Sequence, residues 1–93
     1  MSKFLLVIPQ CLPATQNLVT EHFKLRASWW HWSSDVWLLH FSEAKTVVQL
    51  RDEMMTLLPG IYLLVMQFED RHANWAGWGT QEWQQWFDRY WDR

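Results

Sequence analysis

The chain is poor in the residues that build linkers, disulfides and metal cages. Its 93 residues include three glycines, three prolines and one cysteine. Low-complexity linkers need far more glycine and proline, and one cysteine can form neither an internal disulfide nor a multi-cysteine metal cage. The length allows one domain, and a hydrophobic content of 49% is too high for a disordered chain. We therefore expect a single folded domain over residues 1–93.

Basic charge is also scarce. Eight Lys and Arg residues stand against ten Asp and Glu residues, which gives a net charge of −2, and the basic residues are scattered along the chain. Proteins that bind nucleic-acid backbones present clustered lysine and arginine. Nucleic acid is therefore not an expected partner.

Long apolar runs are missing as well. The run Phe4–Ile8 ends at Pro9, whereas a secretory signal needs roughly 7–15 apolar residues. A membrane-spanning helix needs about 20, and no segment comes close. We expect a cytoplasmic protein that does not enter the membrane.

The apolar pattern predicts four strands. Uninterrupted runs at Phe4–Ile8 and Ile61–Phe68 are typical of central strands that are covered on both faces. Aromatic and β-branched residues on either side of a polar turn predict a hairpin of Ser28–Trp32 and Val36–Phe41.

Two helices fall between these strands. Pro13 can begin one that ends near Leu25, with an inward stripe of Leu18, Val19, His22 and Phe23. Ser42 can cap the second, with Glu43 in its first turn, and its stripe is Val47, Leu50, Met54, Leu57 and Leu58. Pro59 and Gly60 end it. The order β-α-β-β-α-β is that of the α+β ferredoxin-like fold, with two helices on one face of a four-stranded antiparallel sheet.

A tryptophan-rich tail follows at about residues 69–93. A loop carries Trp75 and Trp78, and Thr80 then caps a third helix with Glu82 in its first turn. The apolar stripe of this helix has regular helical spacing and comprises Trp83, Trp86, Phe87, Tyr90 and Trp91. We expect the tail to pack on the sheet or at a dimer interface.

The sheet face opposite the two helices should alternate with polar residues if water covers it, and it does not. The C-terminal helix, a second copy of the chain, or both together can cover it. Aromatic residues are the expected composition of such a contact. We predict a homodimer whose interface includes Trp30, Trp32, Trp37, Trp83, Trp86 and Tyr90.

A ligand site is conceivable around the hairpin and the late loop, formed by Trp29, His31, His40, Trp75 and Trp78. The hairpin register decides whether it forms. With a four-residue loop, His31 and His40 share a face, and with a three-residue loop they separate. Imidazoles that simply pack on indoles are the more common arrangement. The histidine spacing contains no local metal motif, and we predict no catalytic residue, metal site or cofactor.

Several short motifs also suggest a family, namely Ser28-Trp29-Trp30-His31, Val36-Trp37-Leu38, the strand Leu5–Ile8, Leu50-Arg51-Asp52, Leu63-Leu64-Val65 and the loop Trp75–Trp78. On these motifs the chain resembles the small bacterial SinR-like family, which is similar to the CRISPR-associated endoribonucleases of the adaptation complex. Those nucleases are ferredoxin-like dimers, so the resemblance implies this fold and a dimer. It gives no substrate.

The resemblance also argues against nuclease activity. The nucleases place an acidic, metal-binding residue just after the first strand, where this chain has Ile8-Pro9-Gln10. Our leading hypothesis is therefore a non-enzymatic homodimeric module whose tryptophan-rich interface mediates assembly or binds a partner protein. The alternatives are a dimer that binds a small ligand or cofactor, and a catalytically degenerate relative of the nucleases that still holds nucleic acid.

Overall fold

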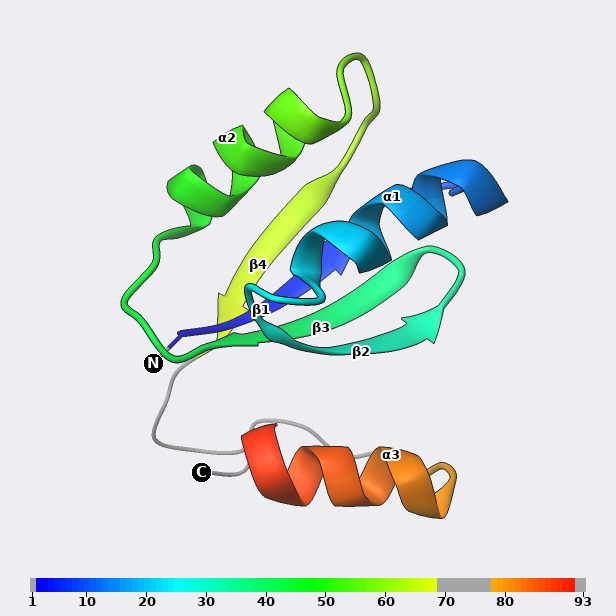
Figure 1. Cartoon of the computed structure of the whole chain (residues 1–93), viewed down its shortest axis with the longest axis vertical. Helices are drawn as coiled ribbons and strands as arrows, with labels where there is room; N and C mark the ends of the chain where they lie inside the picture. Colours follow the sequence, from blue (N-terminus) through cyan, green and yellow to red (C-terminus); the bar gives the residue numbers. More distant parts are fainter. Residues whose placement is uncertain (1, 69–77, 92–93) are drawn as a thin grey trace.

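The computed structural model describes residues 2–68 and 78–91 and has an α+β architecture. One antiparallel sheet holds its strands in the order β2-β3-β1-β4, and three helices pack against it (Figure 1). The strands are β1 (Ser2–Val7), β2 (Ser28–Ser33), β3 (Val36–Phe41) and β4 (Leu64–Phe68). The helices are α1 (Pro13–Phe23), α2 (Val47–Leu57) and α3 (Gln81–Trp86), and a π-helical segment, η1 (Phe87–Trp91), continues α3.

The sheet has β1 and β3 at its centre and β2 and β4 at its edges. The prediction of a central strand at Phe4–Ile8 is confirmed, and the predicted hairpin forms β2 and β3. The prediction of a second central strand at Ile61–Phe68 is wrong. Strand β4 begins only at Leu64, and among the described residues it pairs with β1 alone. An uninterrupted apolar run therefore marks an edge strand here, with Leu64 and Met66 each about half exposed.

Helix α1 begins at the predicted Pro13 and ends at Phe23, slightly before the predicted Leu25. Val19 and Phe23 are buried, whereas Leu18 is 52% exposed and does not belong to the inward stripe. Consecutive residues of an α-helix point about 100° apart. A stripe centred on Val19 and Phe23 therefore leaves Leu18 to one side.

Helix α2 starts later than the sequence predicts. Its N-cap is Thr46, whose hydroxyl accepts a hydrogen bond from the backbone N–H of Gln49, while the Gln49 side chain accepts one from the backbone N–H of Thr46. This reciprocal capping box satisfies two N–H groups at the start of the helix. Ser42 lies outside the helix, so the predicted cap is wrong. The Ser2 hydroxyl donates to the backbone carbonyl of Glu43 and accepts from the backbone N–H of Lys45, which ties the segment before α2 to β1.

Two apolar cores lie on opposite faces of the sheet, because successive strand residues point to opposite sides. The first lies beneath α1 and α2 and contains Phe4, Leu6, Ile8, Cys11, Val19, Phe23, Trp37, Leu39, Phe41, Leu50, Met54 and Leu58. The second lies beneath α3 and η1 and contains Leu38, Trp83, Phe87 and Trp91, with Leu5, Trp30, Phe68 and Trp86 packed around them. The chain's own C-terminal helix therefore covers the second face, as one of the sequence-based alternatives predicted.

The start of the last helix follows the sequence prediction closely. The Thr80 hydroxyl accepts a hydrogen bond from the backbone N–H of Trp83 at 3.2 Å, and Glu82 lies in the first turn. The far end is held by Lys3 of β1. This lysine is 2% exposed, and its ammonium donates a hydrogen bond to the backbone carbonyl of Trp91. The last helix is thus capped at its beginning by the adjacent Thr80, and its end is held to the central strand β1 by Lys3.

Candidate functional site

The two histidines of the predicted ligand site lie on opposite faces of the sheet. His31 pairs with Trp37 across the hairpin, and the register changes between His31 and Ser33, next to the turn. The imidazole of His31 stacks on the indole of Trp37 with ring centres 4.1 Å apart, on the side of the first core. His40 instead lies on the side of α3, with its ring 6.1 Å from that of Tyr90. The separated register is therefore the correct one, and the common-face alternative is wrong.

The stack of His31 on Trp37 is a packing arrangement. Trp37 is fully buried, and in the part of the chain that the structure describes neither its indole nitrogen nor Nε2 of His31 has a hydrogen-bond partner. Trp29 packs beside this region against the first core. These rings cannot line one pocket with His40, because the sheet lies between them.

The residues predicted at a dimer interface mostly pack within the chain. Trp37 is 0% exposed and Trp83 is 3% exposed, so neither offers surface to a second copy in this structure. Trp30 and Tyr90 are partly buried and contact the ring of Trp86, at 6.4 and 5.7 Å between centres. Trp32 retains a substantially exposed side chain, at 46%.

Trp78, the other described member of the predicted ligand site, is 93% exposed, and Trp75 lies outside the described residues. Trp78 belongs to a surface groove of about 220 Å³, which we call the indole groove and which is lined by Trp30, Trp32, Trp78, Gly79, Thr80 and Trp83. The sequence assigned Trp30 and Trp32 to a dimer interface and Trp78 to a ligand site. The structure brings the three together.

Close packing shapes the floor of the indole groove. The ring of Trp32 meets that of Trp83 edge-on, with centres 5.3 Å apart and planes at 63°. A side chain at Gly79 would place its Cβ 3.1 Å from the Trp83 ring, so glycine lets the backbone pass directly over the indole. The Thr80 hydroxyl is engaged in capping α3. The groove therefore offers aromatic surface and few polar groups.

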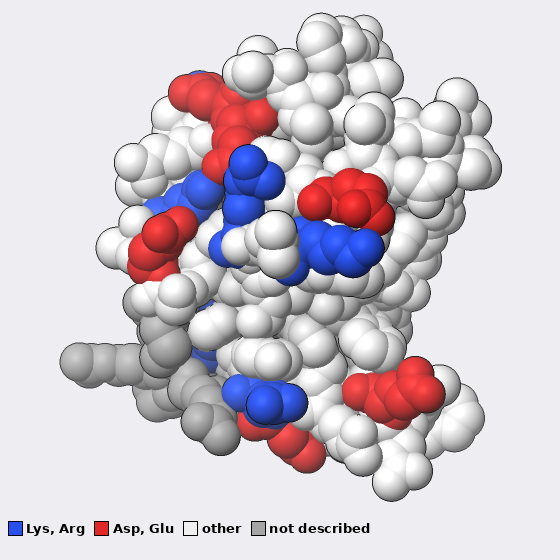
Figure 2. Space-filling model, viewed as in Figure 1, with Lys and Arg blue, Asp and Glu red and all other residues white. Residues whose placement is uncertain are grey.

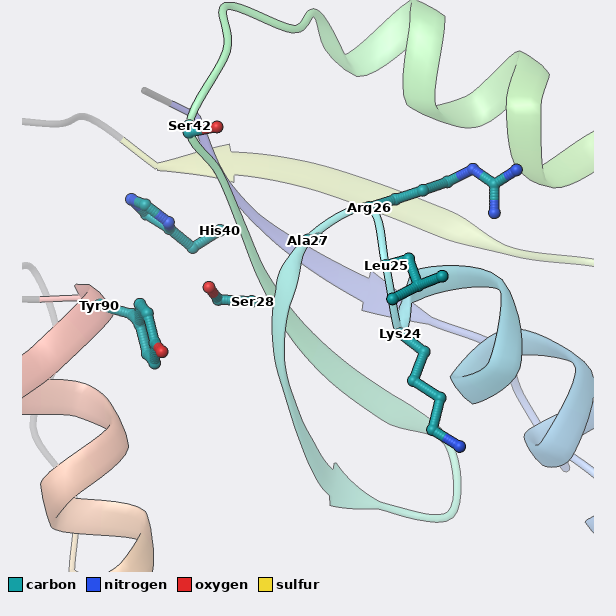
Figure 3. A pocket seen from close by; sticks show the side chains of 8 residues that line it. All are labelled: Lys24, Leu25, Arg26, Ala27, Ser28, His40, Ser42 and Tyr90. Carbon is teal, nitrogen blue, oxygen red and sulfur yellow. The ribbon is translucent and has the colours of Figure 1, made fainter.

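A second cleft, of about 390 Å³, lies between the α1–β2 connection and the end of the last helix (Figure 3). Its lining comprises Lys24, Leu25, Arg26, Ala27, Ser28, His40, Ser42 and Tyr90. The two cations point away from His40 and Tyr90 (Figure 3). Lys24 pairs with Glu21 at 3.2 Å, and Arg26 donates to the backbone carbonyl of His22 at 2.9 Å. The cleft therefore has no converging charges with which to hold an anion.

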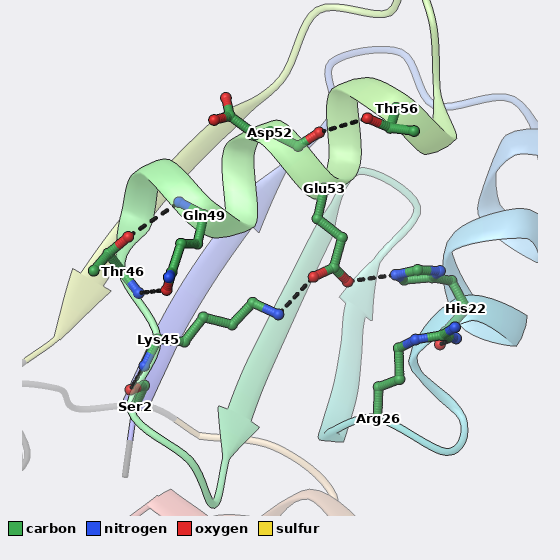
Figure 4. A network of polar contacts seen from close by, with 9 residues as sticks. All are labelled: Ser2, His22, Arg26, Lys45, Thr46, Gln49, Asp52, Glu53 and Thr56. Atoms are coloured by element: carbon green, nitrogen blue, oxygen red, sulfur yellow. Dashed lines mark hydrogen bonds and ion pairs between the residues drawn. The ribbon is translucent and has the colours of Figure 1, made fainter.

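A charged network bridges α1 and α2 (Figure 4). One carboxylate oxygen of Glu53 lies 2.5 Å from Nε2 of His22, and the other lies 2.5 Å from Nζ of Lys45. The Lys45 ammonium also sits 4.6 Å from the centre of the Phe41 ring. The position of Glu53, three residues after the buried Leu50, is the sequence signal that could have placed it on the inward side of α2.

The carboxylate of Glu53 makes this network sensitive to acid. Burial alone would raise the pKa of the Glu53 carboxyl. Hydrogen bonds from Lys45 and His22 lower this pKa by more than burial raises it, so it lies below its ordinary value of 4.5. A carboxylate whose folded-state pKa is lowered stabilises the fold above its unfolded pKa and loses that contribution as pH falls through the folded value. Glu53 therefore stabilises the fold at neutral pH and stops doing so in acid.

We expect Glu53→Gln to destabilise the protein by about 1 kcal/mol at pH 7, because the pair is only partly shielded from water. The difference from wild type should shrink below pH 4.5. Thermal unfolding between pH 7 and pH 3 measures this. Asp52→Asn is the matched control, because Asp52 is an exposed neighbour whose carboxylate pairs with the exposed Arg51. A pH-independent difference for Glu53→Gln would contradict the assignment.

Cys11 and Asp35 join the end of β1 to the hairpin turn. The carboxylate of Asp35 accepts hydrogen bonds from the backbone N–H groups of Cys11 and Gln10, at 2.9 and 3.2 Å. The bond from Cys11 is the main reason that the pKa of Asp35 is lowered. Burial raises the pKa of the Cys11 thiol, and the charge of Asp35 raises it further. A thiol held in its protonated form is a poor nucleophile, so this corner of the fold is structural.

The remaining observations concern metals, membranes and nucleic acid. Within residues 2–68 and 78–91, no three His, Cys, Asp or Glu side chains come together to hold a metal ion. The same residues contain no helix with the length and apolar character that a bilayer crossing requires. On the face seen in Figure 2, the described Lys and Arg side chains lie among Asp and Glu and form no continuous basic area.

Comparison with known proteins gives no relative. No protein-family model matches the chain, and none of the curated proteins or solved structures searched matches it. The resemblance to the SinR-like family therefore stays a prediction. Function has to be argued from the molecule's own surfaces.

Proposed function

We propose that the protein is a homodimeric interaction module with a ferredoxin-like arrangement, in which the β4 edges of two copies pair. The arrangement is supported by the element order β-α-β-β-α-β and the strand order β2-β3-β1-β4. It is also supported by a first core that α1 and α2 share on one face of the sheet. The main observation in favour of a dimer is the outer edge of strand β4.

Strand β4 has none of the features that protect an edge strand from pairing. Its sequence Leu-Val-Met-Gln-Phe contains no charge and no proline, and its pairing with β1 is regular over Val7–Lys3. Monomeric proteins usually block such edges with lysine, proline or a bulge. The opposite edge, β2, is irregular, because its register shifts between His31 and Ser33. The two edges therefore differ, and within the described residues β4 is the edge that no other strand pairs with and no irregularity interrupts.

A second copy of the chain is the occupant that β4 fits best. An antiparallel pair about a two-fold axis places the same strand on both sides, and an uncharged strand pairs with itself without repulsion between like charges. Leu64 and Met66, which are 54% and 50% exposed, would then pack against side chains on the same face of the second copy's β4. Ile61 and Tyr62, just before the strand, add further exposed apolar surface at 40% and 87%.

A groove of about 220 Å³ runs beside this edge and is lined by Val47, Val48, Arg51, Leu63, Leu64 and Val65. This groove lies between α2 and β4, on the sheet face of the first core, whereas Met66 points to the opposite face. A paired strand from a second copy would extend the sheet across the mouth of this groove. Both faces of the β4 edge would then gain apolar contacts, and not only backbone hydrogen bonds.

Leu64→Lys is expected to convert the dimer to a monomer, because it would place two lysines, one from each copy, within a short apolar strand pair, and charged side chains on an edge strand oppose such pairing. Light scattering at 10–100 micromolar, roughly the range in which a weak dimer is populated, measures the mass. Leu25→Lys is the matched control, since Leu25 is 96% exposed and lies far from β4 along the sheet. A wild-type monomer, or equal masses for the two variants, would reject the β4 dimer.

A ligand-binding module is the second candidate function. The observation in its favour is the indole groove, where four tryptophans line one surface depression. The groove lies at the β2 edge, and β4 forms the opposite edge of the sheet. Binding there and pairing at β4 are therefore compatible.

A further inference from the structure

We propose that the indole groove binds a quaternary ammonium group, namely the trimethylammonium head group of choline. Four of its six lining residues are tryptophans, and the other two are Gly79 and Thr80. This inference goes beyond the proposed dimer and does not depend on it. The groove belongs to one chain and is formed by β2 and the beginning of α3.

The lining favours a cation. The face of an indole ring carries negative potential, and tryptophan is the best of the aromatic side chains for holding a cation. No lysine or arginine lines the groove. The charged side chain in the first turn of α3 is acidic, Glu82, and Figure 2 shows no Lys or Arg over the beginning of this helix (lower right).

The scarcity of polar groups selects the kind of cation. A metal ion needs oxygen, nitrogen or sulfur ligands, and an unmethylated ammonium is strongly hydrated with three donors to satisfy. The hydroxyl of Thr80 already accepts the backbone N–H of Trp83. A quaternary ammonium has no N–H groups, spreads its charge over methyl groups and loses less hydration than an unmethylated ammonium does. It is the cation that a mainly aromatic surface suits.

The size and rigidity of the groove agree with this ligand. A volume of about 220 Å³ falls below the roughly 300–1,000 Å³ of sites for drug-sized molecules, so it suits a compact head group. Trp83 is 3% exposed and packs against Gly79 and against Phe87, whose ring centre lies 4.6 Å away. Trp78 leaves 93% of its surface exposed, and a ligand would bury part of that surface. Binding therefore needs little reorganisation of the floor.

Choline and its uncharged isostere 3,3-dimethylbutanol separate a cation site from a merely apolar groove. Nitrogen-15 heteronuclear spectra follow the indole N–H signals, assigned with single Trp→Phe variants. We expect choline to shift the signals of Trp32 and Trp78 with saturation, and the isostere to bind about three- to fivefold more weakly, since a cation over exposed indole rings gains cation–π attraction in addition to contact area. Equal affinity for the two compounds, or no saturable shift with choline, would overturn the proposal.

Variants then locate the site. Trp78→Ala should weaken choline binding by about fivefold or more, and Glu82→Gln by about twofold. Because Trp78 is exposed, its variant should fold normally, which thermal unfolding checks. Tyr62→Ala is the matched control, an 87% exposed aromatic residue outside the groove, and it should bind choline as wild type does. If Trp78→Ala also bound as wild type, choline would be binding elsewhere and the site would be rejected.

Discussion

Trp83→Ala is expected to lower the free energy of unfolding by about 3–5 kcal/mol, the usual cost of removing a large aromatic side chain from a core. Trp83 is 3% exposed and lies at the centre of the second core. Its ring contacts those of Trp32 and Phe87, at 5.3 and 4.6 Å between centres. The cavity cannot close easily, because the rings around it belong both to the sheet and to the helix.

Chemical denaturation followed by far-ultraviolet circular dichroism measures this difference. Trp78→Ala is the matched control, since it removes the same side chain five positions earlier from a site that is 93% exposed. We expect it to change the free energy of unfolding by less than about 0.5 kcal/mol. Similar effects of the two substitutions would mean that α3 does not pack on the sheet, and that a second copy covers this face.

The contrast between these two tryptophans shows which features the sequence could predict. The stripe of Trp83, Phe87 and Trp91 follows from helical periodicity, which is local information, and all three are buried as predicted. The burial of this stripe could therefore be predicted, whereas the sequence left open whether the helix, a second copy or both would cover the sheet face. Trp78 carries no such pattern, so its neighbours in the indole groove could not be foreseen.

Helix and strand ends depend on weaker signals, and one of them misled the prediction. Ser42 and Thr46 are both good N-cap residues. Thr46 is the cap in the structure because Gln49, three residues later, completes the capping box, while Ser2 holds the intervening backbone. The glutamine was visible in the sequence. The contact with Ser2 was not, since it joins residues that are far apart in the chain.

The candidate ligand site failed to assemble for a different physical reason. A one-residue change of hairpin register moves every side chain of a strand to the other face. The irregularity between His31 and Ser33 sets the register that puts His31 on Trp37 and leaves His40 on the other side. Hairpin registers depend on how the turn packs, and here Asp35 is held by backbone N–H groups of the β1–α1 connection. No local pattern reports that contact.

Lys3 is the residue whose role was hardest to foresee, and Lys3→Met is expected to destabilise the fold by about 2 kcal/mol. The sequence shows only a lysine ahead of an apolar run. In the structure its side chain is 2% exposed and its ammonium donates to the backbone carbonyl of Trp91 at the end of the last helix. A hydrogen bond from a charged donor contributes about 1.5–3 kcal/mol, and a cation is favoured at a helix C-terminus. Methionine keeps most of the packing of the lysine stem and removes the charge.

Burying the Lys3 ammonium also costs desolvation free energy, and we expect its hydrogen bond to Trp91 to outweigh that cost. Lys24→Met supplies the reference, since Lys24 is 60% exposed and pairs with Glu21 on the surface of the same chain. Urea unfolding gives the free energies, and near-ultraviolet circular dichroism reports whether the tryptophans of the second core stay ordered. We expect Lys3→Met alone to lose stability and to weaken the aromatic signal. If it unfolds like Lys24→Met, the desolvation of Lys3 cancels its hydrogen bond, and the aromatic core alone holds α3 on the sheet.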